Sequence, residues 1–399
     1  MSRNVLSLAV ALAAAGFVAP TLAVQVCELN GQSVNPNNGY TTEGKTGLMR
    51  CREGEGGPLV REQELQQGKF MGVVRYFKDG TLEREYRVNE RGNRDGLSRE
   101  WARAEAGGKS VLVREETLRD SRTVGIAKSW YPNGQLRRVA FHGDDDREQA
   151  SVEFTTQGQL SELRCAAGPV LGNDFDDKAA CGFAGAASSV TLFSGKGVAK
   201  ARVAFDRGER RKSEALWESG AVRELTEVTA NGGVERSFAA DGTKRRELQW
   251  TTTFGERPRR ITTLDQEFHE SGKLVRERRW RPAERGAELI SEASWYLNGQ
   301  PKSRSEFSLA DGRTVRRETG FHDNGRKSFE AAWRSEVGSG RAELPFGTQQ
   351  NFDAEGRLRG ERIYDERGRI KRERELDERG GVVRDDEVFE DGSRKAVGR

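Results

Sequence analysis

A twelve-residue spacing of glycines is the feature that most constrains this chain. Gly356, Gly368, Gly380 and Gly392 are each separated by twelve residues. Apolar residues stand at offsets of −4, +2 and +8 from these glycines, and they are Phe352, Tyr364, Leu376, Val388, Leu358, Ile370 and Val382. Even offsets fall on one face of a β-strand, and words such as "YDERG" place Gly where a tight turn requires positive φ. Each unit therefore predicts one strand and one turn, with successive strands antiparallel.

The same spacing recurs upstream in the sequence. Further glycines twelve residues apart are Gly68, Gly80 and Gly92, and then Gly208, Gly220 and Gly232. Single copies of the unit are "WYPNGQL" (130–136), "FTTQGQL" (154–160), "FAADGTK" (238–244), "FHESGKL" (268–274), "WYLNGQP" (295–301) and "FHDNGRK" (321–327). An internal repeat determines the fold class. We expect a mostly β protein, an elongated antiparallel β-meander or solenoid of about twelve-residue strand-turn units in a single twisted sheet.

The composition suits a single-layer sheet whose surfaces are exposed to solvent. Hydrophobic residues make up 34% and charged residues 33% of the chain, which has 47 glycines. The regular phase of the aromatic residues argues against disorder. The 67 Lys and Arg residues are interleaved with the 63 Asp and Glu residues, which predicts cross-strand pairing of Arg with Glu. A nucleic-acid-binding protein concentrates its basic residues on one face, so we expect no nucleic-acid partner.

The first 23 residues predict export. Arg3 precedes an apolar run over 5–18, and Thr21-Leu22-Ala23 offers a small residue for cleavage. This pattern is typical of a secretory signal peptide cleaved near Ala23. The run is shorter than the ~20 residues of a membrane-spanning helix, and we expect no transmembrane span elsewhere. The sequence therefore predicts a periplasmic or secreted protein.

Export favours disulfides between the four cysteines, Cys27, Cys51, Cys165 and Cys181. Three pairings are open, and proximity in sequence favours Cys27–Cys51 with Cys165–Cys181. The close Cys-x2-Cys spacing of a structural zinc site is missing from the sequence.

The repeat also predicts the organisation of the chain. After the signal peptide (1–23), residues 24–64 lack the repeat and are expected to form an N-terminal cap containing a disulfide. Repeats follow over 65–164, a disulfide-tied insertion over 165–200, and further repeats over 201–399.

No motif indicates catalysis. His269 and His322 occupy equivalent turn positions, and His142 precedes Gly143 in another turn-like segment. Neither a Gly-x-Ser-x-Gly elbow nor a His-Glu-x-x-His motif occurs. We therefore expect a protein that is not an enzyme, with no catalytic, cofactor-binding or metal-binding residues.

Two other features have a functional and a structural interpretation. The acidic run "GNDFDDK" (172–178) offers oxygen ligands for calcium, but its spacing departs from an EF-hand loop, so we interpret it as an acidic solvated loop. The aromatic stripe could serve as a carbohydrate or peptide platform. Its regular phase favours a packed ladder of aromatic residues that holds the sheet together.

The units "WYPNGQLRRVAF", "YFKDGTLEREY" and "FHESGKLVRERRW" resemble the bacterial MORN-variant repeats of the YwqK type over most of residues 65–395. "FDAEGRL" and "YDERGRI" also resemble the YD repeats of Rhs-type toxin shells, whose units are less charged. The MORN resemblance implies an extended antiparallel sheet that serves as a scaffold or binding surface.

Three functions follow as hypotheses. The first is a non-enzymatic exported protein that binds another protein or an envelope component, or acts as a structural scaffold, in the cell envelope. The resemblance to YwqK-like proteins implies the second, an antitoxin or immunity protein that neutralises a toxin. The third is a module associated with envelope lipids through its mixed charges.

Overall fold

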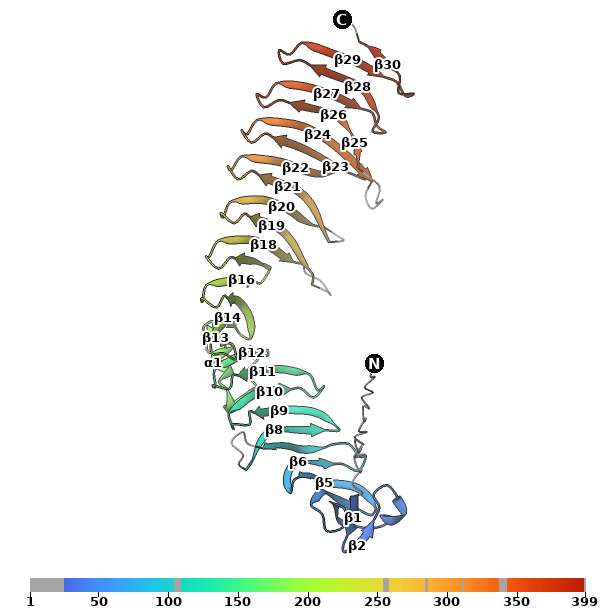
Figure 1. The fold of residues 1–399 in the computed structure, drawn as a ribbon, viewed down its shortest axis with the longest axis vertical. Helices are drawn as coiled ribbons and strands as arrows, with labels where there is room; N and C mark the ends of the chain where they lie inside the picture. The colour runs from blue at the N-terminus through green and yellow to red at the C-terminus, as the bar shows by residue number, and fades with distance from the viewer. Residues whose placement is uncertain are drawn as a thin grey trace, which may run out of the picture. The chain divides into compact units, whose positions relative to one another are not determined.

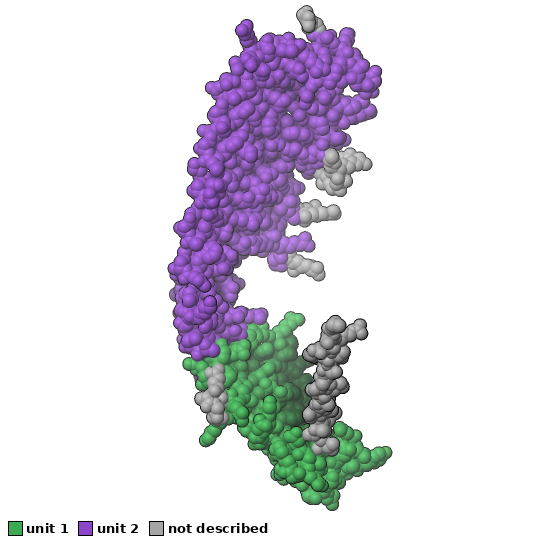
Figure 2. Space-filling model, in the orientation of Figure 1, with its two compact units in different colours: residues 1–149 green, residues 150–399 purple. Residues whose placement is uncertain are grey.

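The computed structural model describes residues 25–103, 109–253, 258–283, 286–310, 312–336 and 343–397. The expected signal peptide, 1–23, lies outside the described residues. The chain divides into two compact units, residues 1–149 and 150–399 (Figure 2).

Unit 1 is built from antiparallel strands. They are β1 (Gln25–Leu29), β2 (Gln32–Val34), β3 (Gly47–Glu53), β4 (Leu59–Gln66), β5 (Lys69–Lys78), β6 (Thr81–Val88), β7 (Gly96–Arg103), β8 (Ser110–Arg119), β9 (Arg122–Trp130) and β10 (Leu136–His142). From β10 back to β3 each strand neighbours the next one in sequence, and β1 then lies between β3 and β2. One 3₁₀ turn, η1 (Gly39–Thr41), joins β2 to β3.

Strand β11 (Glu148–Phe154) crosses the division and pairs with β12 (Leu160–Arg164). The short helices η2 (Gly172–Asp174) and α1 (Asp177–Ala180) follow. An eighteen-stranded antiparallel sheet then begins at β13 (Val190–Phe193). This strand lies within segment 165–200, for which the sequence predicts an insertion.

The strands of the eighteen-stranded sheet lie side by side in chain order (Figure 1). After β13 they are β14 (Ala199–Asp206), β15 (Glu209–Leu216), β16 (Val222–Thr229), β17 (Gly232–Phe238), β18 (Lys244–Thr252), β19 (Arg260–Phe268), β20 (Leu274–Ala283), β21 (Gly286–Trp295), β22 (Pro301–Ala310), β23 (Arg313–Phe321), β24 (Lys327–Glu336), β25 (Leu344–Pro345), β26 (Gly347–Phe352), β27 (Leu358–Tyr364), β28 (Ile370–Leu376), β29 (Val382–Val388) and β30 (Arg394–Ala396). Eighteen strands extend roughly 80 Å across the sheet at the usual strand spacing. The predicted mostly β, antiparallel meander is confirmed, although the strands form two sheets instead of one.

Most of the repeated glycines lie in one recurrent turn. In the turn 365–369, Gly368 has φ +77° and its N–H donates to the carbonyl of Asp365 (3.1 Å), whose own N–H donates to Arg369 O (2.8 Å). This is a type I turn closed by a glycine bulge. The Asp365 carboxylate also accepts the N–H groups of Arg367 and Arg369. The same pair of backbone bonds closes the turns at Gly92, Gly134, Gly158, Gly197, Gly220, Gly242, Gly272, Gly299, Gly325, Gly356, Gly380 and Gly392.

Other glycines of the twelve-residue series lie in a different turn. Asp79 and Gly80 both have positive φ, +49° and +75°, as do Arg207 and Gly208, +49° and +82°. Two central residues with positive φ define the two-residue type I′ turn. The single spacing read from the sequence therefore contains two turn geometries. The prediction of a turn glycine is wrong for Gly232, which is buried in β17 and has no positive φ.

Most of the bulged turns also shift the strand register. Tyr364 pairs with Ile370, whereas the neighbouring Ile363 pairs with Arg372, so Lys371 is an extra residue in β28. The apolar residues that flank the turn thus meet as a cross-strand pair. The prediction that even offsets share one face along the whole strand is wrong, because a bulge interrupts the alternation near the strand end.

Successive bulged turns along one edge of the eighteen-stranded sheet are hydrogen-bonded to each other. Asn298 Nδ2 donates to the carbonyl of Asp323 (2.6 Å), and Asn324 Nδ2 donates to that of Ala354 (2.6 Å). Each asparagine also accepts, through Oδ1, the N–H of the residue two positions later. The Asn-Gly sequence therefore closes its own turn and ties that turn to the next.

Charged side chains cross-link the middle of the sheet. Arg236 Nε lies 3.0 Å from Glu247 Oε2, and Arg246 Nε lies 2.8 Å from Asp265 Oδ1. Glu247 and Asp265 are buried although the sheet is a single layer. The expected cross-strand pairing of Arg with acidic residues is observed.

The aromatic residues pack differently from the expected ladder. The Arg260 guanidinium lies 3.7 Å from the centroid of the Trp250 ring, and that of Arg316 lies 3.9 Å from the Trp333 ring. Among the described residues, more aromatic rings contact an Arg or Lys side chain than contact a second aromatic ring. Cation–π contacts therefore replace most of the predicted ring–ring contacts.

Candidate binding groove over strands β7 to β10

A hollow of about 600 Å³ lies over strands β7 to β10 of unit 1. Small side chains of β9 and β10 form part of its lining, including Ala127, Ser129 and Ala140. Ala140 is buried, with 2% of its surface exposed. A row of small residues lowers the surface of the sheet between taller neighbours, which makes a groove.

Longer side chains line the groove from the adjacent strands. One cross-strand row runs from Glu100 of β7 to Arg114 of β8, then to Ser129 of β9 and Arg138 of β10. Strands two positions apart are separated by roughly 10 Å. The groove above β9 is therefore about as wide as one extended polypeptide segment.

The carboxylates in and beside the groove are neutralised by cations. Glu116 is buried, and its Oε2 accepts from Arg114 Nη2 (2.9 Å) and from Thr123 Oγ1 (3.3 Å). Glu100 lies 3.3 Å from Arg84 Nε, and Arg138 lies 2.6 Å from Glu148. The groove thus combines an apolar floor with paired charges, a surface that can accept a partner without burying an isolated charge.

The histidines singled out in the sequence do not converge. His142 lines the groove, and its Nδ1 is 3.4 Å from the carbonyl oxygen of Asp146. His322 Nε2 is 3.0 Å from the carbonyl oxygen of Phe352 in the next turn along the edge. His269 Nδ1 accepts the N–H of Ser271 in its own turn. Each imidazole is thus engaged locally with its turn or with a neighbouring turn.

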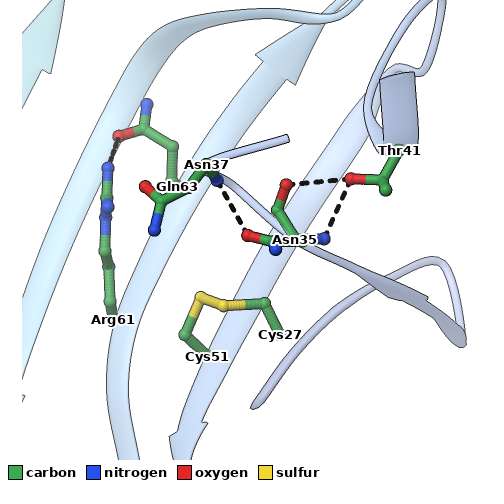
Figure 3. The surroundings of a disulfide bond; sticks show 7 residues. All are labelled: Cys27, Asn35, Asn37, Thr41, Cys51, Arg61 and Gln63. Atoms are coloured by element: carbon green, nitrogen blue, oxygen red, sulfur yellow. Dashed lines mark hydrogen bonds between the residues drawn. A yellow bond between two sulfur atoms is a disulfide. The ribbon is translucent and has the colours of Figure 1, made fainter. Parts of the chain in front are cut away.

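The four cysteines form two disulfides, Cys27–Cys51 (Sγ–Sγ 2.06 Å) and Cys165–Cys181 (1.99 Å), which is the pairing that sequence proximity favours. Cys27 and Cys51 lie directly opposite each other on β1 and β3. They are buried in a cluster with Leu29, Val34, Met49 and Leu65. Figure 3 shows this disulfide beneath the loop that follows β2.

The acidic run 172–178 is used structurally. Asp177 Oδ2 accepts the N–H groups of Val170 (2.7 Å) and Leu171 (2.9 Å), and Asp176 caps α1 by accepting from Ala179 N. Asp177 is only 5% exposed, so the interpretation of this run as solvated is wrong at that residue. Across the described ranges, His, Cys, Asp and Glu side chains do not gather in groups of three or more that could hold a metal ion. None of the helices described there is both long and apolar enough to cross a membrane.

The hairpin β9–β10 also provides the link to known proteins. The sequence model of the MORN repeat variant family, MORN_2, matches residues 123–142. The chain contains a MORN-type repeat. This match covers the hairpin whose small residues line the groove, and it supports the MORN part of the resemblance seen in the sequence.

No curated protein matches the chain. Similar solved structures include TcdB2-TccC3-Cdc42 (9% identity, TM-score 0.18) and TcdB2-TccC3 (11% identity, TM-score 0.18). The alignments cover 88% and 87% of this chain but 20% and 18% of those chains. TM-scores this low do not relate the folds.

The groove was not predicted from the sequence. The available signal was the alternation of small residues in "TVGIAKSW", where Gly125, Ala127 and Ser129 stand at every second position of β9. The walls could not be assigned in the same way, because a register shift between Glu115 and Thr117 alters which β8 residues face the groove.

Proposed function

We propose that this chain is a non-enzymatic, exported repeat protein that acts as a protein-binding scaffold in the cell envelope. The groove over β7 to β10 carries the proposal, because it is a preformed hollow of about 600 Å³ whose lining carboxylates, Glu100 and Glu116, are already paired with arginines. Preformed concave surfaces with few unpaired charges bind partners at low reorganisation cost.

The MORN-type repeat and the disulfides support this role. MORN-type repeats suggest a repeat-based binding or scaffold protein. Two buried or loop-tying disulfides suit an oxidising compartment such as the periplasm or the exterior. The width of the groove favours one extended segment of a partner protein as the occupant.

Affinity capture from native envelope extract, with the chain beginning at Val24, tests the proposal. Ser129→Arg fills the groove, and Ser308→Arg places the same side chain on β22 of unit 2, where Ser308 is exposed. We expect the wild type and Ser308→Arg to recover one stoichiometric protein and Ser129→Arg to lose it. Both variants are first checked for an unchanged melting temperature.

The outcomes separate the alternatives. If the wild type recovers no protein but binds anionic lipid vesicles, the scaffold proposal is wrong and lipid association replaces it. A recovered toxin, rescued on co-expression, would narrow the proposal to an immunity protein. Equal recovery by Ser129→Arg would keep the scaffold and reject the groove as its site.

A further inference from the structure

The loop between β2 and β3 is held in one conformation by its own hydrogen bonds. Thr41 Oγ1 accepts from Asn35 N and donates to Asn35 O, both at 2.9 Å (Figure 3). The same hydroxyl also lies 2.8 Å from Asn38 O, as donor. Asn35 Oδ1 accepts the N–H of Asn37 (3.0 Å). Beneath the loop, the Cys27–Cys51 disulfide fixes β1 to β3. The loop is therefore organised before any ligand arrives.

This ordered loop presents a bare aromatic ring. Tyr40, in η1, is 89% exposed, the highest value for a large hydrophobic side chain in the described part of the chain. Its N–H donates to Asn38 Oδ1 (3.3 Å), which fixes the backbone that carries the ring. Exposure of an aromatic face normally costs free energy, so an exposed ring on an ordered loop marks a contact point.

Polar side chains surround a hollow of about 540 Å³ beside this ring. Its lining includes Asn37, Glu43, Gln67 and Lys69, and within the described residues their side-chain polar atoms make no hydrogen bond or ion pair. The side chains of the β-sheet surfaces, in contrast, are extensively paired. Glu43 and Lys69 carry opposite charges, so the hollow is neutral overall while offering both donors and acceptors.

The amounts of apolar and polar surface decide between ligand classes. A stable protein interface buries about 800 Å² on each partner around an apolar centre. Here the apolar part is the Tyr40 ring with the half-buried Phe70 beside it. A sugar ring needs one aromatic face for its C–H groups and several neutral donors and acceptors for its hydroxyls. An anionic ligand would need an excess of cations, which Lys69 alone does not supply.

We propose that the hollow beside Tyr40 binds a neutral oligosaccharide, with the sugar stacked on the Tyr40 ring and its hydroxyls bound by Asn37, Gln67 and Glu43. This site is separate from the groove over β7 to β10 and does not depend on it. The ordered loop supplies the preorganisation that lets a small ligand bind without first ordering its site.

Titration of the mature chain with soluble neutral oligosaccharides tests the site. The probes are separate gluco-, manno- and N-acetylglucosamine oligomers, followed by calorimetry and by the NMR signals of the Tyr40 ring. We expect one series to bind, Tyr40→Ala to weaken binding about tenfold or more, and Tyr40→Phe to retain it, since the ring supplies the stacking. Asn37→Ala should weaken binding while leaving the loop bonds of Thr41 in place.

Three controls make the result decisive. Phe389→Ala removes another exposed ring, 46% exposed on unit 2, and should leave binding unchanged. Ser129→Arg should also leave it unchanged, which separates this site from the groove. Thr41→Val should weaken binding although Tyr40 is intact, because the loop loses its order. Absence of binding to every neutral series, or wild-type affinity in Tyr40→Ala, would overturn the proposal.

Discussion

Arg362 and Glu373 form an ion pair across β27 and β28, with Nε and Oε1 2.7 Å apart. The Glu373 side chain is 7% exposed, and its second oxygen accepts from Arg394 (2.5 Å). The hydrogen bonds from Arg394 and Arg362 lower the pKa of Glu373. A carboxylate is therefore buried in a single-layer sheet because two other strands, β27 and β30, supply its partners.

Glu373→Gln should destabilise unit 2 by about 1–2 kcal/mol, because a charge-assisted bond is replaced by a weaker neutral one and a guanidinium loses its partner. Urea denaturation followed by far-UV circular dichroism measures the change. Glu375→Gln on the same strand is the control, since Glu375 is exposed and its nearest cation, Arg384, is 3.8 Å away. Equal effects of the two substitutions would show that burial of Glu373 contributes nothing.

Acid should destabilise the C-terminal strands. The pKa of Asp365 falls from its usual 3.8 to about 2, chiefly through the N–H of Arg369, and the Arg372 guanidinium lowers the pKa of Asp385. Because these folded-state pKa values lie below the unfolded ones, the unfolded chain binds more protons in acid. The stabilisation is complete above about pH 4 and is lost as the pH falls towards 2.

Melting temperatures between pH 7 and pH 2 check this dependence. We expect a plateau from pH 7 to 5 and a decline below pH 4. Asp385→Asn removes the negative charge and one of the two acceptor oxygens to which Arg372 donates, both at 2.7 Å. This variant should melt lower than the wild type at pH 7 and converge with it near pH 2. A constant difference at all pH values would contradict the charge-based explanation.

Gly299→Ala should cost about 1–2 kcal/mol, because Gly299 has φ +90° and an L-residue is strained there. A Cβ at this position meets no atom within 4 Å, so the cost is purely one of backbone conformation. Gly299→Asn should cost less, since Asn tolerates this region better. Gly195→Ala is the control, because a Cβ at Gly195 also meets no atom within 4 Å and Gly195 has no positive φ. This substitution should leave stability unchanged or raise it slightly.

Asn324→Ala should lower stability by about 1–2 kcal/mol, since it removes the bond to Ala354 O and the bond from Arg326 N. Asn324→Asp keeps the acceptor for Arg326 and loses the donor to Ala354. Hydrogen exchange of the Arg326 amide should therefore rise in the alanine variant and stay slow in the aspartate variant. Fast exchange in both variants would mean that the link between turns, and not the local turn bond, holds the loop.

The sequence was sufficient for the repeating architecture because the turn chemistry is local. Gly325 and Asn324 act on their own five-residue turn, so their spacing predicts the turn without knowledge of the rest of the sheet. The bulge at Lys371 was not predictable in this way, because it depends on which residue of the partner strand lies opposite. The burial of Glu373 likewise requires Arg394, which lies 21 residues later.

The candidate sites were less accessible from sequence. The shape of the groove depends on the lengths of side chains from four strands. Only the small residues of β9 leave a pattern in the sequence. Tyr40 lies in the N-terminal cap, where no repeat sets the phase of exposed and buried positions. Its exposure follows from the bonds of Thr41 and Asn35, which join residues six apart in a loop of irregular geometry.

The bulged turns at Gly197, Gly220, Gly242, Gly272, Gly299, Gly325, Gly356 and Gly380 all connect strands at the same edge of the eighteen-stranded sheet, since every second connection returns there. Gain or loss of a single twelve-residue unit would reverse every later strand and send its asparagine contacts to the opposite margin. Duplication of a whole hairpin preserves both the direction of the later strands and the side of the sheet on which the asparagine contacts lie. Such a protein can change in length during evolution by steps of two strands, or roughly 10 Å, without rebuilding its hydrogen-bonded margin.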